Sequence, residues 1–158
     1  MVKRHKANQL FRVGIAAFII AILIVAAIIK IIYPSPLLHE FFFIVSIFEI
    51  ALAIAIAVFW ERWKMWALLA LVFATWGGYS LYAAIFGLPC LCLGVAVTLP
   101  HGTSLLVNII LVVLSWVVLK DLRITHKKSL KLALLSCICV IVGFAGASLL
   151  YYIRYFKL

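Results

Sequence analysis

Cys90 and Cys92 are the residues of this chain whose type and spacing most directly suggest chemistry. They stand one residue apart in the segment PCLCLG, after Pro89 and before Gly94. Two such cysteines can join in a disulfide only within a turn, because an extended backbone holds their Cα atoms near the upper limit for the bond. Proline and glycine on either side favour a turn here. The small ring would be strained and easily reduced, which suits disulfide exchange rather than a structural crosslink.

Two other interpretations of Cys90 and Cys92 stay open at this point. The pair could bind a soft metal ion such as copper or zinc, with His101 and either His39 or Glu40 as further ligands. The spacing of these residues matches no known metal-binding template, and we predict no metal. The cysteines could also be small apolar residues that happen to be neighbours.

A second pair, Cys137 and Cys139, lies in a long apolar run near the C-terminus. Residues two apart on a helix point in different directions, so these thiols cannot readily form a disulfide with each other. A relay between the two pairs would have to bridge on the order of 20 Å within a hydrocarbon core about 30 Å thick. A buried cysteine commonly acts as a small hydrophobic residue, and we interpret the second pair in this way.

The composition indicates that the surroundings of these cysteines are a membrane. Hydrophobic residues make up 69% of the 158 residues and charged residues only 11%, whereas about a quarter of a soluble domain is charged. We therefore predict an all-α, polytopic integral membrane bundle that forms one membrane domain over residues 1–158. Its predicted spans, each long enough to cross a bilayer as a helix, lie near residues 11–33, 41–60, 65–87, 104–120 and 132–153.

The net charge of +10 comes mainly from basic residues in alternate loops. These residues are Lys3, Arg4, Lys6, Arg12, Arg62, Lys64, Lys120, Arg123, Lys127, Lys128 and Lys131. Basic residues concentrate in cytoplasmic loops, so we predict a cytoplasmic N-terminus in a bacterial inner membrane. The segment 88–103, with Cys90 and Cys92, then faces the periplasm, where thiols are readily oxidised. No basic helix stands free of the spans, which argues against nucleic acid as a partner.

Three polar residues lie within the predicted spans, where each needs a physical reason. At about 1.5 Å per residue, Lys30 and Asn108 lie roughly 5–6 Å below the outer boundary and Glu49 about 12 Å below it. A lysine side chain can cover this difference, so a pair between Lys30 and Glu49 with Asn108 nearby is feasible. The group could be purely structural, and Lys30 could instead extend to the interface. The functional alternative is that these groups tune a thiol or handle a proton below Cys90 and Cys92.

The third predicted span carries an aromatic stripe formed by Trp76, Tyr79, Tyr82 and Phe86. Such a stripe commonly serves core packing or contact with lipid. It could also form the wall of a site for a quinone or a substrate, and a quinone is the one candidate cofactor that we name. Small residues beside it, including Thr75, Gly77, Gly78 and Ser80, favour close approach of another helix.

The order of these residues resembles the MauE branch of the DoxX-like membrane proteins. In that family a lysine ends the first helix, a glutamate marks the second, C-G-C-F-G follows the third, and Arg-Asn opens the fourth. The matching positions, within roughly residues 11–120, are Lys30, Glu49, the segment PCLCLG and Asn108. Four positions depart from the family pattern, namely Ala53, Leu91, Leu93 and Val107.

The resemblance implies a four-helix bundle laid out as in DsbB and vitamin K epoxide reductase, to which this chain adds a fifth C-terminal helix. It implies that Cys90 and Cys92 are catalytic, with Lys30, Glu49 and Asn108 supporting them. Their partner would be a thioredoxin-like or substrate protein of the periplasm. We therefore expect an inner-membrane protein that assists thiol–disulfide exchange, or electron supply, for an extracytoplasmic partner. The corresponding enzyme class is a thiol–disulfide oxidoreductase.

The main alternative is a non-catalytic accessory subunit that packs against a larger membrane complex and keeps the fold without the redox chemistry. Its nearly all-apolar surface and lack of soluble mass suit such a role. A transporter or channel is a weaker third interpretation, because only one ionisable residue reaches mid-membrane and no inverted repeat is visible.

Overall fold

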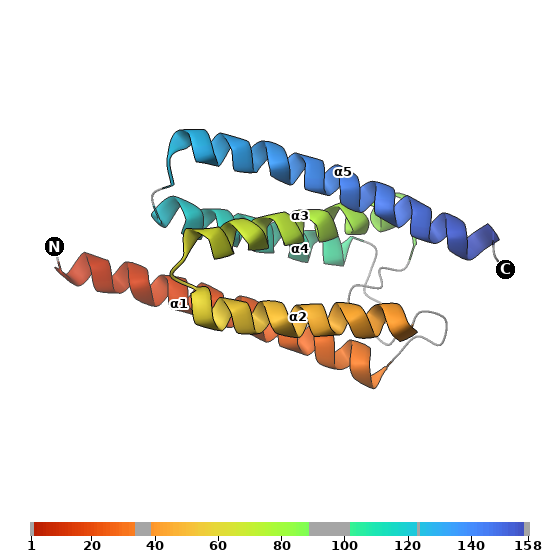
Figure 1. Ribbon diagram of the computed structural model, residues 1–158, viewed down its shortest axis with the longest axis horizontal. Coiled ribbons are helices and arrows are strands. Elements are labelled where there is room, and N and C mark those ends of the chain that lie inside the picture. Colours follow the sequence, from red (N-terminus) through yellow and green to blue (C-terminus); the bar gives the residue numbers. More distant parts are fainter. Residues whose placement is uncertain (1, 34–38, 89–101, 123, 157–158) are drawn as a thin grey trace. The chain divides into compact units, whose positions relative to one another are not determined.

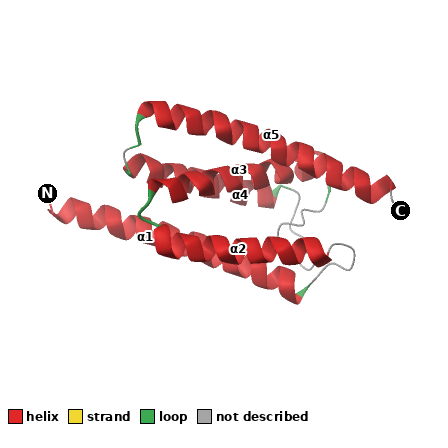
Figure 2. Ribbon diagram, in the orientation of Figure 1, coloured by secondary structure: helices red, strands yellow, loops and turns green. Residues whose placement is uncertain are grey.

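The computed structural model describes residues 2–33, 39–88, 102–122 and 124–156. Within these residues all regular structure is α-helical, as predicted, and no strand occurs. Figure 1 shows the helices, and Figure 2 colours the described loop residues green. In chain order they are α1 (Val2–Ile32), α2 (His39–Phe59), α3 (Trp63–Ile85), α4 (Thr103–Asp121) and α5 (His126–Phe156).

Each of these helices contains a stretch that is long and apolar enough to cross a membrane. The stretches are Gln9–Ile32, Phe42–Phe59, Trp63–Ile85, Thr103–Asp121 and Lys127–Tyr152. Many large apolar side chains along them are exposed, such as Ile44 at 65% and Ile141 at 67%. Water is a poor solvent for such a surface, whereas lipid accommodates it. The described helices are therefore those of a multi-pass membrane protein in contact with a bilayer.

The two ends of the chain show longer helices than the predicted spans. α1 begins at Val2 rather than near residue 11, so the basic N-terminal segment continues the helix. α5 begins at His126 rather than near residue 132 and likewise includes basic residues in its first turns. The spans predicted from hydrophobicity covered only the apolar part of each of these two helices. The polar ends are helical as well, because no proline or glycine interrupts them.

Glycines define two helix ends next to the segment that carries Cys90 and Cys92. α3 ends at Ile85, two residues before the end of the predicted span. Gly87 has φ +62°, and the amide of Leu88 donates to the carbonyl of Ala83 over 2.8 Å, which is the Schellman pattern of helix termination. At α4 the N-cap is Gly102, with φ +92° and no side-chain cap.

The described residues fall into two compact units, which we describe separately. The first unit contains α1 and α2, which lie side by side as an antiparallel pair (Figure 1). The buried residues of each helix recur every three or four positions, as expected for one helix face. On α1 they are Ile15, Ala16, Ile19, Leu23, Ala26, Ala27 and Lys30, and on α2 they are Phe42, Ser46, Glu49, Leu52, Ala53 and Ile56.

The second unit contains α3 from Trp66 onward together with α4 and α5. Two glycines bring α3 and α5 into backbone contact. A Cβ atom on Gly78 would lie 2.0 Å from the carbonyl oxygen of Val140, and one on Gly143 would lie 1.9 Å from that of Thr75. No side chain fits at either position, so each helix presents a glycine to the backbone of the other. The close approach predicted for the small residues of the third span is thus present, and its partner is α5.

Candidate functional site

The first unit contains a buried ion pair between α1 and α2. Nζ of Lys30 lies 2.5 Å from Oε1 of Glu49 and donates a hydrogen bond to it. Both residues are only 3% exposed. The sequence indicated that this pair was feasible, and the structure contains it. A lysine whose ammonium group binds a buried carboxylate does not extend to the interface, so the alternative for Lys30 is wrong.

The position of each charge on its helix explains why the two meet. Lys30 continues the buried stripe of α1, three residues after Ala27, and Glu49 continues the stripe of α2, three residues after Ser46. Each side chain therefore points toward the partner helix rather than toward lipid. Ser46 is also buried, but its hydroxyl donates to the carbonyl of Phe42 in its own helix, at 2.8 Å. The two charges consequently have each other as partners.

One oxygen of the carboxylate is left without a partner. Oε2 of Glu49 is buried and accepts no hydrogen bond from any residue that the structure describes. An unsatisfied buried acceptor is costly, and in native structures it often marks a functional group. The ammonium group of Lys30 carries three hydrogens. The pair can therefore bind a further polar group through the unpartnered oxygen of Glu49.

Asn108 takes part in a separate polar contact in the second unit. Its side-chain amide donates to Oγ of Ser80 on α3, at 3.1 Å, and to the carbonyl of Ser104 one turn earlier on α4, at 2.9 Å. The sequence identified Ser80 only as a small residue, and not as the partner of Asn108. Asn108 belongs to the second unit, whereas Lys30 and Glu49 belong to the first. The predicted grouping of all three residues stays a prediction.

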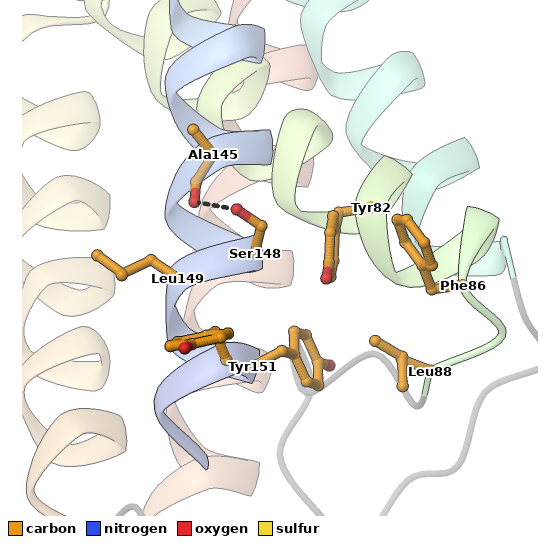
Figure 3. Close-up of a pocket in the computed structure, with 8 residues that line it drawn as sticks. Tyr82, Phe86, Leu88, Ala145, Ser148, Leu149 and Tyr151 are labelled. Atoms are coloured by element: carbon orange, nitrogen blue, oxygen red, sulfur yellow. Dashed lines mark hydrogen bonds between the residues drawn. The ribbon is translucent and has the colours of Figure 1, made fainter. Parts of the chain in front are cut away.

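An open groove of about 850 Å³ lies in the second unit, between the C-terminal parts of α3 and α5. It is lined by Tyr82, Phe86, Leu88, Ala145, Ser148, Leu149, Tyr151 and Tyr152. Figure 3 shows Tyr82 of α3 and Phe86, the residue after the end of α3, facing Ser148 and Tyr151 of α5. The rings of Tyr82 and Tyr151 are stacked, with centroids 5.7 Å apart, and those of Tyr82 and Phe86 are 4.5 Å apart.

The aromatic stripe predicted on the third span thus divides between two roles. Trp76 packs edge-on against Phe73, with ring centroids 5.8 Å apart, and Tyr79 stacks on Tyr151 at 6.3 Å. These contacts are packing. Tyr82 and Phe86 line the groove. The contribution of α5 to this groove was not predicted from the sequence.

Cys90 and Cys92, the predicted catalytic pair, lie outside the described residues. The metal alternative depends on the same two cysteines and on His101, which also lies outside them. In the part of the chain that is described, no three His, Cys, Asp or Glu side chains gather in one place. Cys137 and Cys139 on α5 are free thiols, the first exposed and the second half-buried.

Comparison with family models, with curated proteins and with solved structures finds no match to this chain. The resemblance to the MauE branch therefore stays a prediction, carried by the residues that suggested it.

Proposed function

We propose that this chain is an inner-membrane protein of the MauE type, with a four-helix core and an added α5, that assists thiol–disulfide exchange on an extracytoplasmic partner. Cys90 and Cys92 are its exchanging pair. The observation that carries the proposal is the buried contact between Lys30 and Glu49, with its unpartnered Oε2. A charge pair inside a membrane-crossing helix pair is expensive and is commonly retained for function.

The order of the helices supports a link between this pair and the cysteines. Helices that cross a membrane in turn alternate in direction, so the end of α1, the start of α2 and the end of α3 share one side. Lys30 lies near the end of α1, and Glu49 lies in the first half of the apolar stretch of α2. Cys90 follows the end of α3 by only a few residues. On this proposal the charge pair and the thiols belong to the same half of the membrane.

The proposed exchange balances without any further reactant. A dithiol of the partner attacks the disulfide between Cys90 and Cys92, a mixed disulfide forms, and the second partner thiol then resolves it. Two electrons and two protons pass from the partner to the cysteine pair. Reoxidation of Cys90 and Cys92 passes the two electrons to a separate acceptor, for which a quinone is the candidate, and releases the two protons. Glu49 with Lys30 supplies a buried place that can accept and pass on a proton. In this proposal Asn108, near the start of α4, belongs to the same half of the membrane and supports the site.

The candidate cofactor for the reoxidation is a quinone, which would supply a two-electron acceptor when bound. The described residues that fit such a ring are the aromatic walls of the groove, above all Tyr82, Phe86 and Tyr151. Flat rings stack on aromatic side chains, and the tyrosine hydroxyls can donate hydrogen bonds. The groove includes Leu88, so it lies at the end of α3 that leads to Cys90.

Capture of the mixed disulfide tests the proposal. Cys92→Ala and Cys90→Ala each leave one thiol of the pair, which can still run the exchange in reverse by attacking the disulfide of an oxidised partner. Because the second thiol of the pair is missing and cannot resolve the mixed disulfide, the variant that keeps the exchanging thiol should accumulate a covalent complex with the partner that a reducing agent dissolves. Cys137→Ala/Cys139→Ala is the matched control, because it also removes thiols and should leave the result unchanged.

The accessory-subunit alternative predicts a different outcome. In that case neither single variant captures a protein, Cys90→Ala/Cys92→Ala keeps full function in cells, and the chain purifies with a stoichiometric membrane partner. The exposed aliphatic side chains along α5, such as Leu134 at 60%, suit a partner helix as well as lipid.

A further inference from the structure

The outward face of α5 changes from basic to aliphatic along one line. Lys127 and Lys131 are exposed, and Leu134, Ile138 and Ile141 follow them with exposed fractions of 60%, 54% and 67%. The spacing of these positions alternates between four and three residues, which places all five on one side of a helix. We call this surface, defined by these five residues, the basic–aliphatic face.

The opposite side of α5 is the side that packs within its unit. Gly143 contacts the backbone of Thr75, and Ala147 and Tyr151 are buried. The basic–aliphatic face therefore points away from α3. It is exposed because α5 packs on α3 through its other side, at the crossing formed by Gly78 and Gly143, which we call the glycine crossing.

The segment near this face carries a strong excess of positive charge. The segment 120–131 contains Lys120, Arg123, Lys127, Lys128 and Lys131 against the single acid Asp121. Lys120 is exposed at the end of α4, close in the chain to the start of α5. A surface of this kind attracts anions, and clustered basic residues next to a membrane-crossing helix favour anionic headgroups.

The length of the aliphatic part matches one leaflet. From Lys131 to Ile141 the helix rises roughly 15 Å at about 1.5 Å per residue, which is half of a hydrocarbon core about 30 Å thick. A phospholipid that places its phosphate at the lysines can therefore lay an acyl chain along the remaining three residues. A free phosphate would use only the lysines, and a partner helix would need acidic residues at one end.

We propose that the basic–aliphatic face of α5 is a binding site for an anionic glycerophospholipid of the leaflet on the side of the α4–α5 turn. Lys127 and Lys131 bind the phosphate, and Leu134, Ile138 and Ile141 contact an acyl chain. This assignment does not depend on the exchange activity proposed above.

The test compares two variants of the full-length chain, purified in a neutral detergent, for retention of phosphatidylglycerol over phosphatidylcholine by native mass spectrometry. Lys127→Gln/Lys131→Gln removes two charges from the site. Arg62→Gln/Lys64→Gln is the matched control, since it removes two exposed charges at the α2–α3 turn, which the alternating direction of membrane-crossing helices puts on the same side of the membrane. We expect the affinity for phosphatidylglycerol to fall roughly fivefold for each lysine removed from the site, and by a clearly smaller factor in the control.

Three results would overturn the assignment. An equal loss in both variants would mean that net charge alone attracts the lipid. Displacement of the lipid by millimolar inorganic phosphate would mean a site for the phosphate group only. Unchanged affinity when Ile138→Ala/Ile141→Ala is tested in the wild-type lysine background would mean that the acyl chain does not follow this face. Circular dichroism of each variant confirms that its helices are retained.

Discussion

Lys30 and Glu49 form a hydrogen-bonded ion pair, 2.5 Å from Nζ to Oε1, between two helices that are each apolar enough to cross a membrane. A buried ion pair contributes little net stability, because desolvation of both charges offsets their attraction. An apolar pair of similar volume would hold α1 and α2 together at least as well. Stability alone therefore does not explain why this chain places two charges here.

Changing one residue of the pair should cost more stability than changing both. Lys30→Met leaves the carboxylate buried without a cation and should lower the free energy of unfolding by about 3–5 kcal/mol. Glu49→Gln should cost less, because Lys30 lies two residues from the end of α1 and its freed side chain can reach the interface. Lys30→Met/Glu49→Leu should restore stability to the wild-type level or above. Unfolding in detergent, followed by circular dichroism, measures all three.

The double variant also separates structure from function. If the charges serve the exchange reaction, Lys30→Met/Glu49→Leu is stable but exchanges thiols slowly. A stable double variant with the wild-type rate would show that the pair is only structural. A double variant as unstable as Lys30→Met would contradict the expectation that desolvation offsets the attraction between Lys30 and Glu49.

The glycine crossing of α3 and α5 gives a second prediction, on stability. Gly143→Ala forces a Cβ atom onto the backbone of Thr75, so α5 must move away from α3, at a cost of about 1–3 kcal/mol or more. Gly146 lies on the same helix with nothing within 4 Å of the position of a Cβ atom. Gly146→Ala should be neutral or stabilise the helix by up to about 1 kcal/mol. Thermal unfolding of the two variants checks the contrast, and equal effects would contradict the crossing.

The fold was predictable from the sequence where apolar runs determine it. Each apolar run became a helix, and the depths of Lys30 and Glu49 in their runs made the pair that the structure contains feasible, without excluding extension of Lys30 to the interface. The helix ends at Gly87 and Gly102 could not be placed from apolarity, because they depend on positive φ at glycine.

The contacts of α5 could not be predicted from sequence, because they depend on which helices become neighbours. Gly78 was recognisable as a position for close packing, but nothing in the sequence identified Gly143 as its counterpart. For the same reason Asn108 was expected beside Lys30 and Glu49, while its described partner is Ser80. Local pattern determines which side chains are buried, and tertiary arrangement determines their partners.

The central claim is that Cys90 and Cys92 cycle between dithiol and disulfide on the outer face of the membrane. The most direct measurement is to quench intact cells with acid, label free thiols with a polyethylene-glycol maleimide, and count the added masses in a Cys137→Ala/Cys139→Ala background. We predict no label on the oxidised pair and two labels after brief treatment of the cells with a membrane-impermeant reductant, reversed when the reductant is removed. Two labels under every condition, with no reversible disulfide, would contradict the claim.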